Sequence, residues 1–301
     1  MPVEEKKQYG ARKGSFGYLC LCYYASATFK NLDPATQLWH HRALDLICEK
    51  HGDNVVDDLK DKHIRKLRDE LVRAASKKRL KALKALFSWA VDAEEASHNP
   101  TIGVRPIKYP EIGIPTWSEE EITQYEKHHE IGTSARLAMA LMLYTACRLE
   151  DAIRFGPQHF RNGRVQFAQA KNEHRRDPVS IDIKIHRDLR AIIDATPLPH
   201  LVQANGQPAS FGRFLVVRNA RPFTPRHFGK RFKDWCRQAN LPHCSSHGLR
   251  KAAARRLAEV GCTTHEIMSY TGHKSLKEVE RYTKEARKAK LADAAMAKLK
   301  G

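Results

Sequence analysis

Residues 246–251 read Ser-His-Gly-Leu-Arg-Lys and place His247 three positions before Arg250. On a helix, side chains three residues apart lie on the same face, so this histidine and arginine point the same way. An arginine offers a two-pronged donor to a phosphate, and a histidine gives or takes a proton near neutral pH. Taken alone, H-x-x-R also fits an ordinary surface pair that contributes little.

Two short stretches follow toward the C-terminus. Residues 271–275 read Thr-Gly-His-Lys-Ser, and residues 280–283 read Glu-Arg-Tyr-Thr. A helix predicted to begin at Ser275 places Tyr282, nine residues after His273, two turns along its length. A single tyrosine in such a helix is more usually a half-buried packing residue.

A third stretch lies upstream. Residues 144–151 read Tyr-Thr-Ala-Cys-Arg-Leu-Glu-Asp and overlap the end of an apolar helix predicted for residues 135–145. Arg148 therefore follows a helix directly, with Glu150 and Asp151 beside it. The two acids either form a simple surface ion pair with the arginine or hold its guanidinium toward a site.

Together, the three stretches resemble the tyrosine recombinase (phage integrase) family. The family's R-x-x-[E/D] element corresponds to residues 148–151, its H-x-L-R box to residues 247–250, and its G-H…Y-T ending to residues 272–283. Alternating apolar residues predict two strands joined by a polar loop, and the family's hairpin lysine corresponds to Lys171 at that turn. The match covers the second domain, and the basic, helical first domain resembles the family's core-binding domain by pattern only.

The resemblance implies a transesterification without metal or other cofactor. Tyr282 would attack a DNA backbone phosphate, form a 3′-phosphotyrosine link and free a 5′-hydroxyl, and a partner strand's 5′-hydroxyl would reverse the step. The implied supporting roles are charge stabilisation by Arg148, Arg250 and His273, proton acceptance or phosphate-side donation by His247, protonation of the departing oxygen by Lys171, and orientation of Arg148 by Asp151 and, secondarily, Glu150.

The fold class expected is mainly α with a small β-sheet (α+β). Helical periodicity runs through residues 1–99, and prolines and glycines interrupt it over residues 100–117. We therefore expect a helical DNA core-binding domain at 1–99, a linker at 100–117, and an integrase-like catalytic domain at 118–301. A weak apolar stripe near residues 291–299 agrees with a C-terminal exchange segment that docks onto a neighbouring subunit.

The chain is strongly basic. Lys and Arg number 53 against 34 Asp and Glu, a formal net charge of +19, and most of the excess lies in residues 118–301. Such an excess predicts a polyanionic partner. The start of a predicted helix in the first domain carries Lys77, Lys78, Arg79, Lys81 and Lys84, which fit a solvated face and a DNA-facing face equally well. We carry these five side chains forward as candidate DNA contacts.

The cysteine content and the lengths of the apolar stretches bear on the cellular location of the chain. Seven cysteines form an odd, scattered set that fits reduced thiols, and a zinc set of Cys20, Cys22, Cys48 and His51 is less in keeping with the sequence than burial. No apolar stretch reaches 18 residues, so we expect no membrane span. The expected partners are double-stranded DNA recombination sites and three further copies in a homotetramer on DNA, with no small-molecule substrate. The expected location is the bacterial cytoplasm, at the nucleoid.

Three alternatives stay open on the sequence. A type IB topoisomerase would use the same tyrosine chemistry to relax supercoils. A catalytically silent DNA-binding protein would keep the scaffold without the reaction. A basic helical RNA-binding protein would account for the charge, although no aromatic RNP-type motif is visible.

Overall fold

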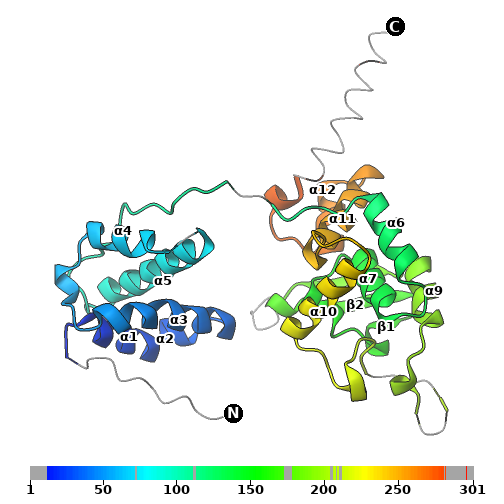
Figure 1. Ribbon diagram of the computed structural model, residues 1–301, viewed down its shortest axis with the longest axis horizontal. Coiled ribbons are helices and arrows are strands. Elements are labelled where there is room, and N and C mark those ends of the chain that lie inside the picture. The colour runs from blue at the N-terminus through cyan, green and yellow to red at the C-terminus, as the bar shows by residue number, and fades with distance from the viewer. Residues whose placement is uncertain are drawn as a thin grey trace. The chain divides into compact units, whose positions relative to one another are not determined.

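The computed structural model describes residues 12–71, 73–110, 113–172, 178–203, 206–207, 209, 212–280, 282 and 296. The chain divides into two compact units, residues 1–112 and 113–301, and each has a hydrophobic core of its own (Figure 1).

The N-terminal unit is built from helices. They are α1 (Phe16–Ala25), α2 (Ala27–Lys30), α3 (Pro34–His51), the 3₁₀ turn η1 (Val56–Asp58), α4 (Asp61–Asp69) and α5 (Arg73–Asp92). As the sequence predicts, α3 begins with Pro34 directly after Asp33 and ends at Gly52. The stripe of α5 that includes Leu83 and Phe87 is fully buried, and α5 packs against α1, α3 and α4. This stripe is what assembles the bundle.

The segment expected to be a linker, residues 100–117, has both ends inside folded units. Val104 is buried in the core of the N-terminal unit. Trp117 is buried in the core of the C-terminal unit, where its indole Nε1 donates a 2.8 Å hydrogen bond to the backbone oxygen of Ser245. The stretch between the two cores is therefore shorter than proline content alone indicates.

The C-terminal unit is arranged around one apolar helix. Its helices are α6 (Glu119–His128), α7 (Ser134–Thr145), α8 (Leu149–Ala152), α9 (Arg187–Ala195), α10 (Pro225–Gln238), α11 (Ser246–Glu259) and α12 (Thr264–Thr271), and residues 276–280 are also helical. Most of α7 is buried, and α8, α9, α10 and α11 pack against it. A capping box begins α6 at Ser118 and α12 at Thr263, and the sequence predicts both starts.

A small antiparallel sheet completes this unit. Its strands β1 (Phe160–Arg161), β2 (Arg164–Ala168) and β3 (Ser180–Lys184) lie in the order β1-β2-β3. Val165 pairs with Ile183 and Phe167 with Ile181, so alternate apolar side chains face the core. The two predicted strands are confirmed, and the two-residue β1, too short to give a period, is added across the turn at residues 162–163.

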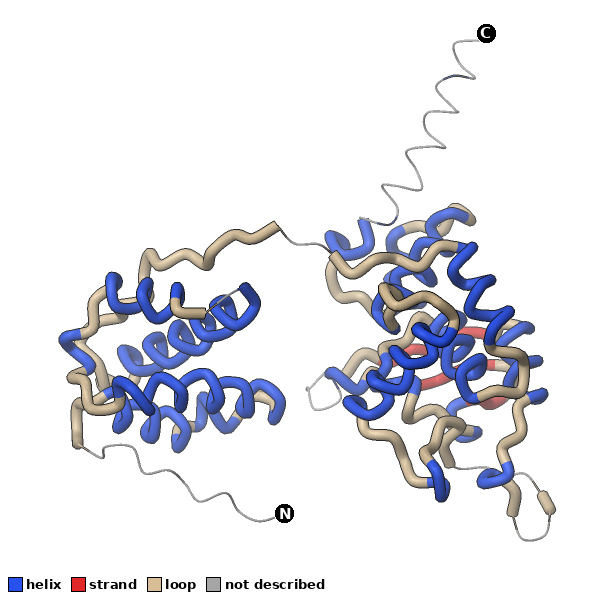
Figure 2. Tube along the Cα trace, in the orientation of Figure 1, coloured by secondary structure: helices blue, strands red, loops and turns tan. Residues whose placement is uncertain are grey.

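The remaining short turns are η2 (Pro157–His159), η3 (Ala170–Asn172), η4 (Pro199–Leu201) and η5 (Arg218–Ala220). Figure 2 shows the described strands among the helices of the C-terminal unit. The expected fold class, mainly α with a small sheet, is confirmed. Among the described residues, no helix combines the length and apolarity that a bilayer crossing requires.

Candidate active site

Arg250 is buried inside the C-terminal unit without a carboxylate hydrogen-bonded to it among the contacts of the described residues. Its side chain is 4% exposed, on α11. Nη2 donates a 2.8 Å hydrogen bond to the backbone oxygen of Thr271, and Nη1 donates to that of Ala146. Burial, followed by the charge of Arg148, lowers the pKa of Arg250 to about 10. The guanidinium stays charged at neutral pH, and an arriving anion would compensate that charge.

Arg148 comes close to Arg250 because the chain turns sharply after α7. Ala146 ends that helix in the left-handed region, with φ 48° and ψ 24°. This conformation is uncommon for a residue other than glycine, and it ends the helix at this point. Arg148 then begins α8, half-buried, and its Nη1 donates to the side-chain oxygen of Gln169.

Asp151 supports Arg148 differently from what the sequence implied. Its carboxylate accepts a 3.0 Å hydrogen bond from the backbone nitrogen of Arg148 and a 2.7 Å bond from that of Ala170. Asp151 is the third residue of α8, so its side chain reaches back to the start of its own helix. The described contact that orients the guanidinium comes from Gln169, and Glu150 is exposed on the surface.

Sequence reasoning missed Gln169, which is fully buried at the end of β2. Its Nε2 donates a 2.9 Å hydrogen bond to the backbone oxygen of Thr271. The signal was present, because the inward-facing positions 165 and 167 continue to position 169 in the same period of two. A polar residue on a buried face of a strand has to find buried partners.

His273 follows α12 at a left-handed glycine. Gly272 has φ 69°, and a Cβ there would lie 2.3 Å from Nε2 of Gln169. Nδ1 of His273 lies 2.5 Å from the hydroxyl of Thr271, which itself donates a 2.7 Å bond to the oxygen of Ile267. Because that hydroxyl has one proton, Nδ1 of the neutral ring donates to it, and Nε2 carries a lone pair.

Burial and the positive charges around His273 keep its ring neutral. Nε2 lies 3.4 Å from Nη2 of Arg250. Burial, then Arg250, Arg148 and His247, lower the pKa of His273 to about 4. His247 is exposed at the start of α11, and its pKa is also lowered, first by partial burial and then by Lys251, Arg250 and Arg148. Both imidazoles therefore favour the neutral form at neutral pH.

Tyr282 lies beside this group. Its ring centroid is 6.5 Å from that of His273, and the half-buried ring packs on a small apolar cluster that includes Ala258, Ile267 and Val279. Lys171 is exposed in η3, and the bond from Ala170 to Asp151 ties this turn to the start of α8. The structure therefore gathers Arg148, Arg250, His273 and Tyr282 directly, while His247 and Lys171 lie on adjoining turns. The stripe predicted at residues 291–299 lies outside the described residues, apart from Met296.

The five candidate DNA contacts on α5 do not stay together. Lys78, Lys81 and Lys84 are exposed and Lys77 is half-buried. Arg79 is buried at 6% exposure, where Nη1 donates to Glu70 at 2.9 Å and to the oxygen of Leu67 at 3.0 Å. Arg79 falls on the core-facing side of the helix, so we remove it from the candidate contacts.

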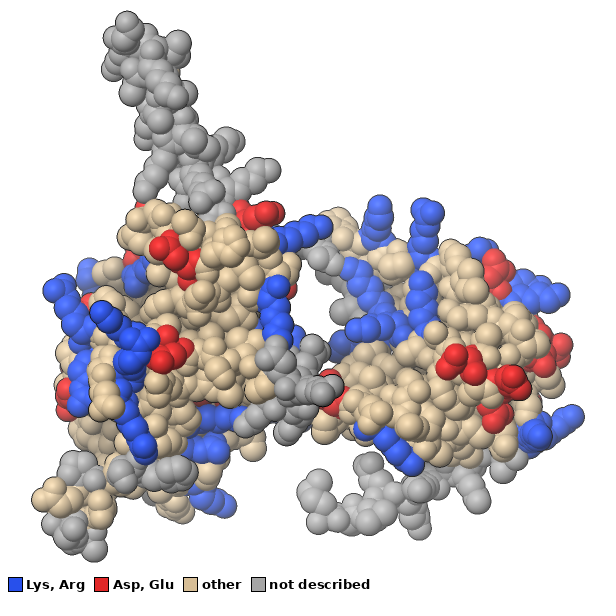
Figure 3. All heavy atoms as spheres, turned by 180° about the vertical axis from the view of Figure 1, so that it is seen from behind, with Lys and Arg blue, Asp and Glu red and all other residues tan. Residues whose placement is uncertain are grey.

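A basic face on α10 was missed. The exposed side chains are Arg226, Lys230, Arg231, Lys233 and Arg237, opposite the buried Phe228 and Phe232. The signal was the apolar spacing of four residues. In the view of Figure 3, Lys and Arg side chains are prominent on the surface of each unit, with Asp and Glu interspersed.

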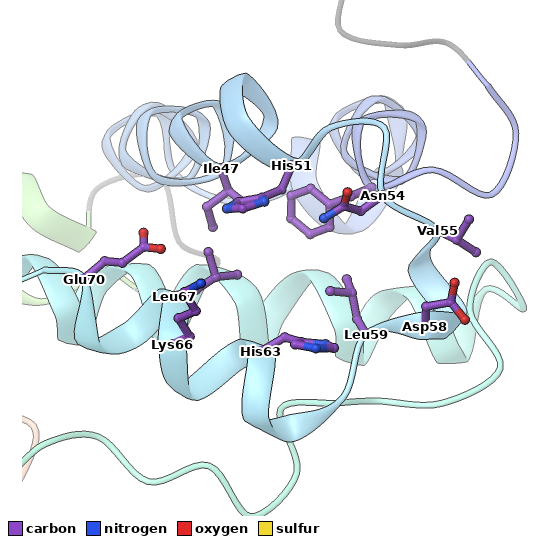
Figure 4. Close-up of a pocket in the computed structure, with 11 residues that line it drawn as sticks. Ile47, His51, Asn54, Val55, Asp58, Leu59, His63, Lys66, Leu67 and Glu70 are labelled. Atoms are coloured by element: carbon purple, nitrogen blue, oxygen red, sulfur yellow. The ribbon is translucent and has the colours of Figure 1, made fainter.

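Two other features have the form of a binding site, a pocket in the N-terminal unit and a group of three potential metal ligands in the C-terminal unit. A pocket of about 270 Å³ in the N-terminal unit is lined mainly by residues of α3, of α4 and of the segment between them, such as Ile47, Leu59 and Leu67 (Figure 4). It contains none of the predicted catalytic residues. Among the described residues, Glu121, His243 and Cys244 bring potential metal-ligand atoms within 4.8 Å of one another.

This second group fits a hydrogen-bonded cap better than a metal site. Glu121 accepts a 2.7 Å bond from the backbone nitrogen of Ser118, and its other oxygen is in direct hydrogen-bond contact with Nε2 of His243. Two ligands of one tetrahedral zinc ion lie farther apart, at about 3.3 Å for bonds of about 2.0 Å. We assign no metal to the group. Of the earlier zinc set, Cys20 and Cys48 are buried in the N-terminal core.

Comparison with known proteins agrees with this geometry. Residues 117–289 match the model of the phage integrase family. Tyrosine recombinase XerC of Escherichia coli (strain K12 / DH10B) is 23% identical over 276 residues, which cover 84% of this chain and 87% of XerC.

Two solved structures share the fold. A lambda integrase dimer bound to a COC′ core site has a TM-score of 0.68 and 20% identity, covering 88% of this chain and 92% of that one. A lambda integrase tetramer bound to a Holliday junction has a TM-score of 0.72 and 18% identity, covering 89% of this chain and 77% of that one.

Proposed function

Because this chain belongs to the phage integrase family and is a tyrosine-type site-specific DNA recombinase, we propose that the hydroxyl of Tyr282 is its nucleophile. The phenol oxygen attacks the scissile phosphorus and loses its proton, the bond from phosphorus to the 5′-oxygen breaks, and that oxygen takes up a proton. The products are a 3′-phosphotyrosine and a free 5′-hydroxyl. The 5′-hydroxyl of a second strand reverses the step and releases Tyr282.

The observation that carries this proposal is the buried guanidinium of Arg250 beside the rings of His273 and Tyr282. Arg250 is bonded to two backbone carbonyls, which leave its full charge in place. A buried, uncompensated cation costs stability, and binding of a phosphate would compensate its charge. Together with Arg148, it would neutralise the charge that builds on the non-bridging oxygens of the phosphate.

The proton transfers fall to His247 and Lys171 in this proposal. The lowered pKa of His247 favours its neutral form at pH 7, so it can accept the phenol proton or donate a hydrogen bond to the phosphate. Lys171 projects from the exposed η3 turn and would protonate the departing 5′-oxygen. Asp151 would position Arg148 and Lys171 through the backbone, since it joins the start of α8 to Ala170.

DNA binding is proposed for both units. The exposed Lys78, Lys81 and Lys84 of α5 support a core-binding role of residues 1–99, and the basic face of α10 supports a footprint of the catalytic domain. The lambda integrase tetramer on a Holliday junction supports a tetramer here. Exchange of the C-terminal segment between subunits is proposed on the family resemblance. Bacterial relatives support action on nucleoid DNA in the bacterial cytoplasm.

A trapping assay tests the chemistry. The purified chain would first select its preferred DNA site from a random library. Duplexes with that site and a nick beside the scissile position would then be incubated with wild type and with Tyr282→Phe, because the freed short strand diffuses away and leaves the adduct. We expect a covalent protein–DNA band for wild type alone on denaturing gels.

The opposite results favour the alternatives. Tight, salt-sensitive binding without an adduct would overturn the enzymatic proposal and leave a catalytically silent DNA-binding protein. Relaxation of a supercoiled plasmid that lacks the selected site, without strand exchange between two sites, would identify topoisomerase-like activity.

A further inference from the structure

One buried amide joins the two arginines of the site. The side-chain oxygen of Gln169 accepts from Nη1 of Arg148, and its Nε2 donates to the backbone oxygen of Thr271 at 2.9 Å. The backbone oxygen of Thr271 also accepts a 2.8 Å hydrogen bond from Nη2 of Arg250. A guanidinium only donates and a carbonyl only accepts, so a primary amide between them is fixed in one orientation.

The backbone on both sides of this amide is held. The nitrogen of Gln169 donates to the oxygen of Val179 at 2.9 Å, which extends the pairing of β2 with β3 by one residue. On the other side, α12 ends at Gly272, and a Cβ at this residue would lie 2.9 Å from Ile181 and 2.3 Å from the amide of Gln169. Glycine therefore lets the carbonyl of Thr271 approach the sheet closely enough to meet Gln169.

The side-chain amide of Gln169 is uncharged, and this matters for phosphate binding by the two arginines. The charge of Arg148 lowers the pKa of Arg250, after the larger effect of burial. A carboxylate at position 169 would relieve this repulsion, but it would also offset the charge that a phosphate is to meet. An amide orients Arg148 and leaves both positive charges available.

We propose that Gln169 is a positioning residue for DNA cleavage, which fixes the guanidinium of Arg148 relative to that of Arg250 through the carbonyl of Thr271. The proposal rests on the phosphate-binding role assigned to the two arginines above. Gln169 acts through Arg148 and lies behind it, fully buried at the end of β2.

The test compares two scissile groups in the trapping assay, a normal phosphodiester and an uncharged methylphosphonate. For Gln169→Leu we expect cleavage of the phosphodiester to slow by roughly 10- to 100-fold, the usual cost of losing a group that orients a reactive residue. On the methylphosphonate, which carries no negative charge for a guanidinium to meet, Gln169→Leu and wild type should differ by less than about 3-fold. DNA affinity should stay within about 2-fold of wild type.

Two further variants keep the result interpretable. Gln169→Glu retains a polar group in the same space and should show the same selective loss, because its carboxylate competes with the phosphate. Gln166→Leu, exposed on the same strand and bonded to Asp182, should cleave both substrates as wild type does.

The outcomes separate the possible failures. Equal slowing of Gln169→Leu and Gln169→Glu on both substrates would mean that Gln169 serves the fold alone, and wild-type rates on the phosphodiester would mean that it is dispensable. Either result overturns the positioning role. Absence of any adduct with the wild-type chain on the phosphodiester would instead overturn the proposed function on which the positioning role rests.

Discussion

The carboxylate of Asp151 accepts a 3.0 Å hydrogen bond from the backbone nitrogen of Arg148. It also accepts a 2.7 Å bond from the nitrogen of Ala170, which precedes Lys171. One buried carboxylate therefore fixes the main chain beside two of the proposed catalytic side chains. The sequence places Asp151 correctly beside Arg148, but helix geometry directs its oxygens to the amide at the start of α8.

Substitution Asp151→Ala should destabilise the C-terminal unit and slow cleavage together. It leaves two partly buried amide nitrogens without acceptors, at a cost of about 1–3 kcal/mol in the free energy of unfolding. Urea denaturation would measure this loss, with Glu150→Ala, exposed on the same helix, expected within about 0.5 kcal/mol of wild type. A loss of cleavage with unchanged stability would point to a direct contact with the guanidinium instead.

Substitution Arg250→Met should separate activity from stability. Removing the buried charge abolishes the anion clamp, so adduct formation should fall at least about 100-fold. The free energy of unfolding should stay within about 1 kcal/mol of wild type or rise, because methionine fills similar space without a desolvated charge. Arg190→Met, at an exposed position of α9, is the control for cleavage. A fall of several kcal/mol would show that the two carbonyl contacts hold the fold together.

The sequence predicted those features that repeat along the chain. The apolar stripe of α5, the capping boxes at Ser118 and Thr263, and the alternation of β2 and β3 are local patterns, and the structure confirms them. Each needs only neighbours within a few residues to be recognised.

Local patterns of this kind could not predict the contacts between segments far apart in the sequence. Gln169 meets Thr271, 102 positions away, and nothing local marks the pair. Arg79 was grouped with its lysine neighbours because composition does not distinguish a solvated cation from one paired inside with Glu70. In both cases burial and partner choice, which the assembled fold decides, determine the role of a polar side chain.

The glycine before His273 offers a matched pair of substitutions. Gly272→Ala and Gly163→Ala place alanine at nearly equal backbone angles, φ 69° and φ 70°, but the methyl group at 163 meets open space. We expect about 1 kcal/mol of destabilisation at 163 and about 1–3 kcal/mol more at 272, where the methyl group strikes Gln169. Thermal unfolding measures the difference. Equal losses of stability in the two variants would show that the residues around Gln169 rearrange to accommodate the methyl group.

Acid should destabilise the C-terminal unit through His273. Its folded pKa of about 4 lies below the ordinary value of 6.5, so the unfolded chain binds the proton more readily. This contribution is present above pH 6.5 and is lost as the pH falls toward 4, and its size is on the order of 2 kcal/mol. His273→Gln should therefore lose less stability than wild type between pH 7 and pH 4.5.

The control for this measurement is His265→Gln, at an exposed position of α12. It should follow the wild-type curve of unfolding free energy against pH. If His273→Gln instead gives the same dependence of unfolding free energy on pH as wild type, other buried groups account for the acid sensitivity. His40 of the N-terminal unit is one such group.

Salt dependence should reveal whether α5 faces DNA. Replacing Lys78, Lys81 and Lys84 by Gln removes up to three phosphate contacts, so the slope of log affinity against log salt should become shallower by about 0.9 per contact. The triple change at Lys30, Lys50 and Lys62, exposed on other helices of the same unit, alters the net charge equally. Fluorescence anisotropy with one duplex at several salt concentrations compares the two. If both triples flatten the slope equally, the effect is one of overall charge, and α5 is not the DNA-facing helix.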